Sequence, residues 1–118
     1  MSNAHRSQNQ YGMTNYIEVQ ITTTTQAEAE RLSDVLLENR LAACVQISGP
    51  IQSNYTWEGK RESTPEFLCC VKTDQSLFQS LVETVRANHS YECPQIVAIP
   101  ILTANDDYLD WMKSSLGQ

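Results

Sequence analysis

The sequence predicts one α+β domain, in which helices cover an antiparallel sheet and a further helix ends the chain. The main observation is that apolar residues recur with the period of strands and of helices in the order β-α-β-β-α-β-α. Length agrees with this, because a chain of 118 residues can bury one modest hydrophobic core but not two.

The first strand is predicted over residues 17–22, where apolar and polar side chains alternate. A helix should follow, because Thr25 and Glu28 have the spacing of a capping box. Its apolar positions recur at helical spacing up to about Asn39. These segments form the first βα unit.

A hairpin is predicted next. Residues 42–57 are strand-like but are interrupted at Gly49-Pro50, where a bulge or bend is expected because proline cannot donate to a ladder. Glu58-Gly59 indicates a tight reversal, and residues 65–73 form the return strand.

The second helix is predicted from a capping box formed by Ser76 and Gln79, and it should end near Asn88. Residues 96–102 form a fourth strand, and Pro100 favours a place at a sheet edge.

Asn105 or Asp106 can cap a last helix. Two right-handed crossovers around a hairpin give a ferredoxin-like β-α-β-β-α-β antiparallel sheet with both helices on one side, followed by the additional C-terminal helix.

Both faces of the third and fourth strands are apolar, over residues 67–71 and 96–102. Two helices cover only one face of a four-stranded sheet, so something else must exclude water from the other. The terminal helix could cover that face. We expect another subunit to do so.

The ends of the chain and its hydropathy bear on location. Residues 1–12 are polar and without periodicity, and they are predicted to be a disordered extension of a domain over 13–118. No apolar run approaches the roughly 20 residues of a membrane span, and the start lacks the apolar stretch of a signal peptide. The sequence predicts a cytoplasmic protein.

Charge and motifs exclude several functions. The formal net charge is −6, with 14 acidic and 8 basic residues and no Lys or Arg cluster, so neither nucleic acid nor a membrane is an expected partner. No nucleophile elbow, Walker A, zinc-protease or dinucleotide motif occurs. We therefore predict no enzyme activity and no organic cofactor.

The cysteines are candidate ligands. None of the four belongs to a CxxC pair, so reduced thiols are expected. Strand parity puts Cys44 on the more polar face of its strand, where an ion or a subunit could reach it; alternatively it fills a gap. The only histidine within the predicted domain, His89, either contacts the terminal carbonyls of its helix or joins a thiolate around copper or zinc.

Other side chains stand out near the hairpin. Tyr55 and Trp57 share a strand face, where they either pack the hairpin or line a subunit contact. Lys72 interrupts an apolar strand, so it reaches solvent, pairs with a carboxylate such as Glu66, or binds an anion.

Several short motifs together resemble the CutA divalent-cation tolerance family, over nearly the whole chain from Tyr16 to Leu116. They are Leu41-Ala42-Ala43-Cys44-Val45, Tyr55-Thr56-Trp57-Glu58-Gly59-Lys60, Glu66, Lys72-Thr73, His89-Ser90-Tyr91 with Pro94-Gln95-Ile96-Val97, and Tyr108-Leu109 with Trp111.

The resemblance implies a ferredoxin-like fold, a homotrimer joined by edge strands, and a response to copper and other divalent metal ions. It implies Cys44 as a metal ligand, and an inter-subunit cleft lined by Trp57, Glu66, Lys72 and Tyr91, with His89 beside them. We predict Cys44 and His89 as the metal ligands.

Three positions depart from the family pattern: Ser90 replaces a usual proline, Arg61 an aliphatic residue and Gln95 a glutamate. Cys69, Cys70 and Cys93 lie outside the pattern and are interpreted as packing residues. The alternative function is a regulatory or scaffolding trimer that binds a small anion or a protein partner in its clefts. A weak hydrolase that uses His89 is disfavoured, because no activated nucleophile lies near it in the sequence.

Overall fold

The computed structural model describes residues 14–118. The predicted extension over residues 1–12 lies outside this range. The described chain contains, in order, β1 (Tyr16–Thr23), α2 (Gln26–Glu38), β2 (Cys44–Trp57), β3 (Lys60–Asp74), a short 3-10 turn (Gln75–Leu77), α3 (Phe78–Asn88), β4 (Ile96–Pro100) and α4 (Asp106–Ser115).

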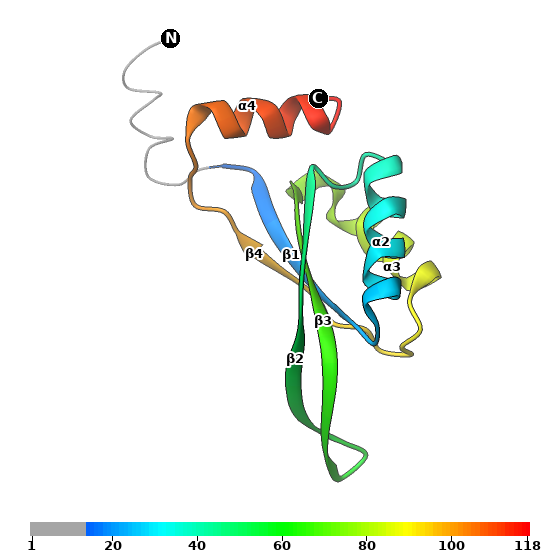
Figure 1. Cartoon of the computed structure of the whole chain (residues 1–118). Helices are drawn as coiled ribbons and strands as arrows, with labels where there is room; N and C mark the ends of the chain where they lie inside the picture. Colours follow the sequence, from blue (N-terminus) through cyan, green and yellow to red (C-terminus); the bar gives the residue numbers. More distant parts are fainter. Residues whose placement is uncertain (1–13) are drawn as a thin grey trace.

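The four strands form one sheet in the order β2-β3-β1-β4, and every neighbouring pair is antiparallel. Helices α2 and α3 lie together on one face of this sheet (Figure 1). The predicted ferredoxin-like topology is therefore confirmed. Pro100 is the last residue of the edge strand β4, so its predicted edge position is confirmed, whereas the predicted strand up to residue 102 is two residues too long.

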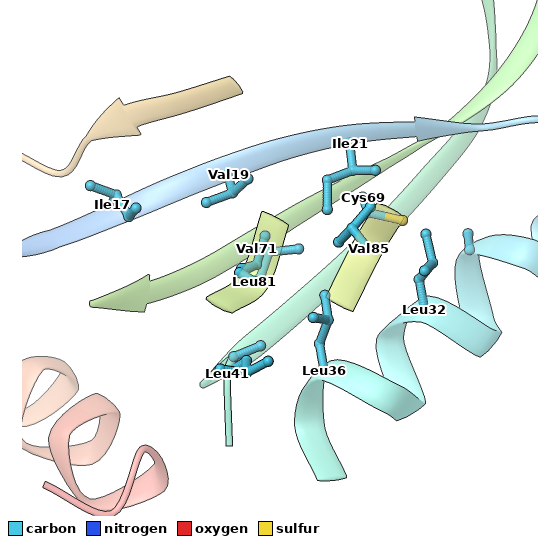
Figure 2. Packing of buried hydrophobic residues seen from close by; sticks show 12 residues of the cluster. Ile17, Val19, Ile21, Leu32, Leu36, Leu41, Cys69, Val71, Leu81 and Val85 are labelled. Atoms are coloured by element: carbon cyan, nitrogen blue, oxygen red, sulfur yellow. The ribbon is translucent and has the colours of Figure 1, made fainter. Parts of the chain in front are cut away.

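The hydrophobic core lies between the sheet and the two helices (Figure 2). Leu36 of α2 is 1% exposed, and Leu81 of α3 is fully buried. They meet the inward side chains of β1 and β3, among which Val19 and Val71 are fully buried. Burial of one such side chain stabilises the fold by roughly 1.5–3 kcal/mol. Because α2 and α3 cover these side chains, water is excluded from this face of the sheet within one chain.

The first helix begins as predicted. Thr25 is the N-cap of α2, and its Oγ1 accepts a hydrogen bond from the Glu28 N–H at 3.1 Å.

The predicted Ser76 and Gln79 capping box is wrong. Instead, the Asp74 carboxylate accepts a hydrogen bond from the Ser76 N–H at 2.8 Å and starts the 3-10 turn, so that α3 begins only at Phe78. Asp74 is the last residue of β3, so its carboxylate lies where it can cap the turn that follows the strand.

The β2–β3 hairpin is longer than the sheet beside it. β1 pairs with β3 only from Phe67 to Asp74, whereas residues 60–66 of β3 pair with β2 alone. A two-stranded arm over residues 51–66 therefore projects beyond the rest of the molecule (Figure 1). The prediction that this strand starts at Pro65 is wrong, because residues 60–64 are held by pairing with β2 and bury no apolar face.

The predicted irregularity at Gly49-Pro50 is confirmed, because the β2–β3 register shifts between Ser48 and Ile51. Gly49 has a φ of +144°, and a Cβ there would lie 2.8 Å from the ring of Phe67. Only glycine fits this approach of two backbones.

Helix α4 packs against one end of the sheet, where Met112 and Leu116 form a second small cluster with Ala43. It does not cover the sheet face opposite α2 and α3, which we call the open face. Two apolar side chains of β4 on this face, Val97 and Ile99, stay 47% and 42% exposed. The alternative that α4 covers the whole open face is therefore wrong. Among residues 14–118, no helix is long and apolar enough to cross a membrane.

Candidate functional site

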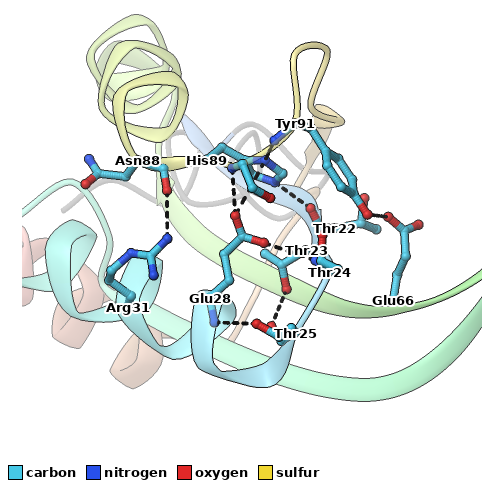
Figure 3. Close-up of polar contacts among 11 residues, drawn as sticks. Thr22, Thr23, Thr24, Thr25, Glu28, Arg31, Glu66, Asn88, His89 and Tyr91 are labelled. Atoms are coloured by element: carbon cyan, nitrogen blue, oxygen red, sulfur yellow. Dashed lines mark hydrogen bonds and ion pairs between the residues drawn. The ribbon is translucent and has the colours of Figure 1, made fainter.

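A polar junction forms where the loop after α3 meets the N-terminus of α2 (Figure 3). Glu28 lies at its centre. One carboxylate oxygen of Glu28 accepts a hydrogen bond from the Thr24 N–H at 3.1 Å, and the other accepts one from the Ser90 N–H at 2.8 Å. Glu28 thus caps its own helix and fastens a loop 62 residues away in sequence.

Opposing effects set the charge of Glu28. Burial disfavours the carboxylate, but the backbone N–H groups of Ser90 and Thr24 stabilise it, and the net result is a lowered pKa. The side chain is only 6% exposed. Its charge is therefore held by hydrogen bonds and not by solvent.

The His89 side chain is fully buried in the same junction. Its Nε2 lies 2.7 Å from the Thr22 carbonyl oxygen, and its Nδ1 accepts a hydrogen bond from the Tyr91 N–H at 3.0 Å. Because a carbonyl can only accept, Nε2 carries the proton and the ring is neutral. Both nitrogens are used, so His89 has no lone pair free for a metal, and it contacts β1 rather than the carbonyls of its own helix.

The loop is also tied to the base of the arm. Tyr91 donates a hydrogen bond from its hydroxyl to the Glu66 carboxylate at 2.6 Å. Burial and the Glu66 carboxylate both raise the pKa of Tyr91, so the phenol remains a donor. Glu66 is 6% exposed, and the described structure places no basic side chain against it.

A groove of about 630 Å³ opens between the arm and this loop. Two of its side chains, Glu66 and Glu92, are carboxylates, and no Lys, Arg or His lines it within the described structure. Its electrostatics therefore favour a cation over an anion. The lining residues are Thr22, Ser53, Asn54, Tyr55, Trp57, Glu66, Ser90, Tyr91, Glu92, Cys93 and Gln95.

Three of the four predicted cleft residues, Trp57, Glu66 and Tyr91, meet at this groove. Lys72 does not. It lies six residues from Glu66 along β3, about 20 Å away at the rise of an extended strand. Its Nζ donates to the Gln46 side chain at 3.2 Å and lies 5.4 Å from the centre of the Tyr108 ring. The considered Lys72–Glu66 pair does not form within one chain.

The two predicted metal ligands are also apart. Cys44 is half-buried and pairs across the sheet with Lys72, which in turn pairs with Glu18. His89 contacts Thr22, four residues further along β1, which corresponds to about 13 Å. Among residues 14–118, no three His, Cys, Asp or Glu side chains converge on one point.

The other cysteines have different surroundings. Cys69 is 1% exposed in the core, as a packing residue should be, and burial raises the pKa of its thiol to about 11. Cys70 is half-buried. The interpretation of Cys93 as a packing residue is wrong, because its thiol is exposed in the groove loop, outside any helix or strand.

The aromatic residues of the arm stay partly exposed. Tyr55 and Trp57 are 41% and 49% exposed. Sequence reasoning also missed the second role of Glu28. The capping box was visible, but the Ser90 N–H that completes the junction comes from a distant loop.

Comparisons with known proteins place the chain. Residues 17–115 match the family model described as CutA1 divalent ion tolerance protein. The chain is 42% identical over 99 residues to the chloroplastic protein CutA of Arabidopsis thaliana, and the match covers 84% of this chain and 54% of that protein. It is 41% identical over 99 residues to the divalent-cation tolerance protein CutA of Thermus thermophilus, and the match covers 84% of this chain and 96% of that protein.

Solved structures agree. A periplasmic divalent cation tolerance protein CutA from Archaeoglobus fulgidus superposes with a TM-score of 0.83 at 42% identity, covering 86% of this chain and 98% of that one. CutA1 from Oryza sativa superposes with a TM-score of 0.83 at 41% identity, and the match covers 85% of this chain and 92% of that one. The chain spans about half the length of the plant relatives it matches, 54% and 56%. On sequence and on structure, the chain belongs to the CutA1 divalent ion tolerance family.

Proposed function

We propose that this chain is a metal-binding tolerance protein that takes up copper or another soft divalent ion and acts as an assembly of three copies, in the cytoplasm, without catalysing a reaction. The observation that carries the metal part is the position of Cys44. Its free, half-buried thiol lies on the open face. Thiolates select soft metal ions over magnesium and calcium.

The ligand set in this proposal does not include His89, whose ring nitrogens are both engaged by the backbone. Cys44 is the remaining member of the predicted pair, and the one that the family resemblance implies as a ligand. Family membership supports the link to divalent cations, because relatives carry that function in their names.

Assembly is supported by the outer edge of β2. This strand is 14 residues long, lies at the edge of the sheet and contains no Asp, Glu, Lys or Arg. An isolated edge of this kind pairs with other chains unless charge or proline blocks it, and Pro50 is the only such residue. The two-stranded arm beyond it would also be marginal alone.

The cleft residues support assembly as well. Glu66 is buried with no cation from residues 14–118 beside it, and Lys72 lies about 20 Å away on the same strand. The inter-subunit cleft of Trp57, Glu66, Lys72 and Tyr91 can therefore only be completed by residues from two copies. Static light scattering should give three times the 13.3 kDa chain mass. A monomer at micromolar concentration would contradict the assembly.

The metal part is tested with Cys44→Ser, which keeps the size of the side chain and removes the soft donor. Anaerobic Cu(I) titration against a competing chelator should show at least a tenfold loss of affinity, about 1.4 kcal/mol, with the assembly intact. Cys69→Ser is the matched control. It should lower stability, because a hydroxyl is placed in the core, and leave the affinity unchanged.

The alternative is a regulatory or scaffolding trimer that binds a small anion or a protein. The groove argues against an anion, since Glu66 and Glu92 line it and no basic residue of the described chain does. Binding of any member of a nucleotide panel, with no response to metal, would favour this alternative.

A further inference from the structure

We propose that Cys44 and Cys70 together form a two-thiolate site for one Cu(I) ion on the open face. This inference rests on the proposed metal-binding function and adds a ligand, Cys70, that no motif pointed to.

Strand register brings the two thiols together. Cys44 of β2 pairs with Lys72 of β3, and Cys70 of β3 pairs with Gln46 of β2. Cys44 and Cys70 are therefore diagonal neighbours on adjacent strands. Diagonal neighbours lie roughly 7–8 Å apart, and their Cβ atoms are somewhat closer to each other.

Both side chains lie on the same face. The flanking residues Cys69 and Val71 are buried in the helix-covered core, so Cys70 points to the open face by strand alternation. Val45 packs against that core, which puts Cys44 on the open face too. Both thiols are free and half-buried. They are reached from the open side of the sheet.

The spacing suits an ion and not a disulfide. A disulfide needs Cβ atoms about 3.5–4.5 Å apart, closer than diagonal positions provide. A metal with a thiolate bond of about 2.3 Å on each side bridges a wider gap. Cu(I) is a soft ion that accepts two thiolates in a linear arrangement, so it needs no third protein ligand. This agrees with the lack of any three-residue ligand cluster in residues 14–118.

Charged neighbours decide the cost of ionising the pair. Burial is the largest effect raising the pKa of Cys70, and Glu18 raises it further, whereas the Lys72 ammonium lowers it. Lys72 reaches Gln46 across the other diagonal of the same four residues, so its positive charge lies beside the pair. A bis-thiolate Cu(I) centre carries one negative charge, which the Lys72 ammonium offsets and the neighbouring Glu18 carboxylate opposes.

Binding is a simple exchange. Two S–H bonds break, two S–Cu bonds form, and two protons leave to solvent, while copper stays Cu(I) throughout. Affinity for Cu(I) must therefore fall as pH decreases.

The test is an anaerobic Cu(I) competition titration of the full chain and three single variants, Cys44→Ser, Cys70→Ser and Cys69→Ser. The first two should each lower the affinity at least tenfold. The double variant Cys44→Ser with Cys70→Ser should lose little more than either single one, because a two-coordinate site fails when one ligand is gone. Cys69→Ser is the control, since that thiol is buried in the helix-covered core, and where it is folded it should bind as the parent does.

X-ray absorption of the copper-loaded protein should count two sulfur neighbours per ion, and circular dichroism should show that Cys70→Ser is folded. Parental affinity in a folded Cys70→Ser variant would overturn the thiol pair and leave Cys44 as ligand. Parental affinity in Cys44→Ser would overturn the proposed metal function as well. A copper ion with one sulfur neighbour would also reject the pair.

Discussion

The two faces of the sheet belong to the same strands but differ in how complete they are. On the helix-covered face, Val19 and Val71 are fully buried by α2 and α3. On the open face, Val97 and Ile99 are 47% and 42% exposed, and α4 covers only one end. The chain itself covers the first face. The open face needs another group to exclude water from it, and it carries the half-buried thiols of Cys44 and Cys70.

The largest expected effect tests the covered face with two adjacent leucines of α2. Leu36 is 1% exposed and Leu37 is 42% exposed. Leu36→Ala should lower the free energy of unfolding by about 2–5 kcal/mol, because it leaves a cavity under the helix. Leu37→Ala should change it by less than about 1 kcal/mol. Urea denaturation measures both, and equal losses would show that the helix buries its leucines in another way.

The polar junction beside the core should show the next largest effect. Ser90→Pro removes the N–H that donates to Glu28 and should cost about 1–3 kcal/mol, because the buried carboxylate loses a partner. Ser90→Ala keeps the N–H and removes only the hydroxyl, which also interacts with Glu28, so it should cost less than the proline variant. The unfolding midpoints compare them. A proline variant as stable as the alanine variant would mean that this hydrogen bond contributes nothing.

Glu28 itself should make stability depend on pH. Its pKa is lowered in the folded chain from the ordinary 4.5, so its contribution is full above 4.5 and is lost as pH falls through the lowered value. Glu28→Gln should flatten that part of the profile of unfolding free energy against pH. Glu30→Gln, on the exposed side of the same helix, should leave the profile unchanged.

The smallest effect on a single chain is expected at the arm. Trp57 is 49% exposed, so Trp57→Ala should change the free energy of unfolding of one chain by less than about 0.5 kcal/mol. If copies meet at the arm, the same change should raise the protein concentration at which light scattering shows the assembly. A variant that assembles as the parent does would remove Trp57 from the contact.

Much of the fold could be predicted because its signals are local. Alternation at residues 17–21 marks a strand, and Thr25 with Glu28 marks a helix start, whatever the rest of the chain does. The start of β3 could not be predicted in this way, since residues 60–64 are extended only because β2 lies beside them.

For the site, the sequence by itself determined a set of candidate residues, and strand parity placed Cys44 on the more polar face. Only the tertiary structure decided which of them meet. Both ring nitrogens of His89 contact backbone atoms. Lys72 lies far from Glu66 on the same strand, and Cys70 lies diagonal to Cys44. The physical reason is that register and loop closure join segments far apart in the chain, and those distances are set by the packed sheet and not by any local pattern.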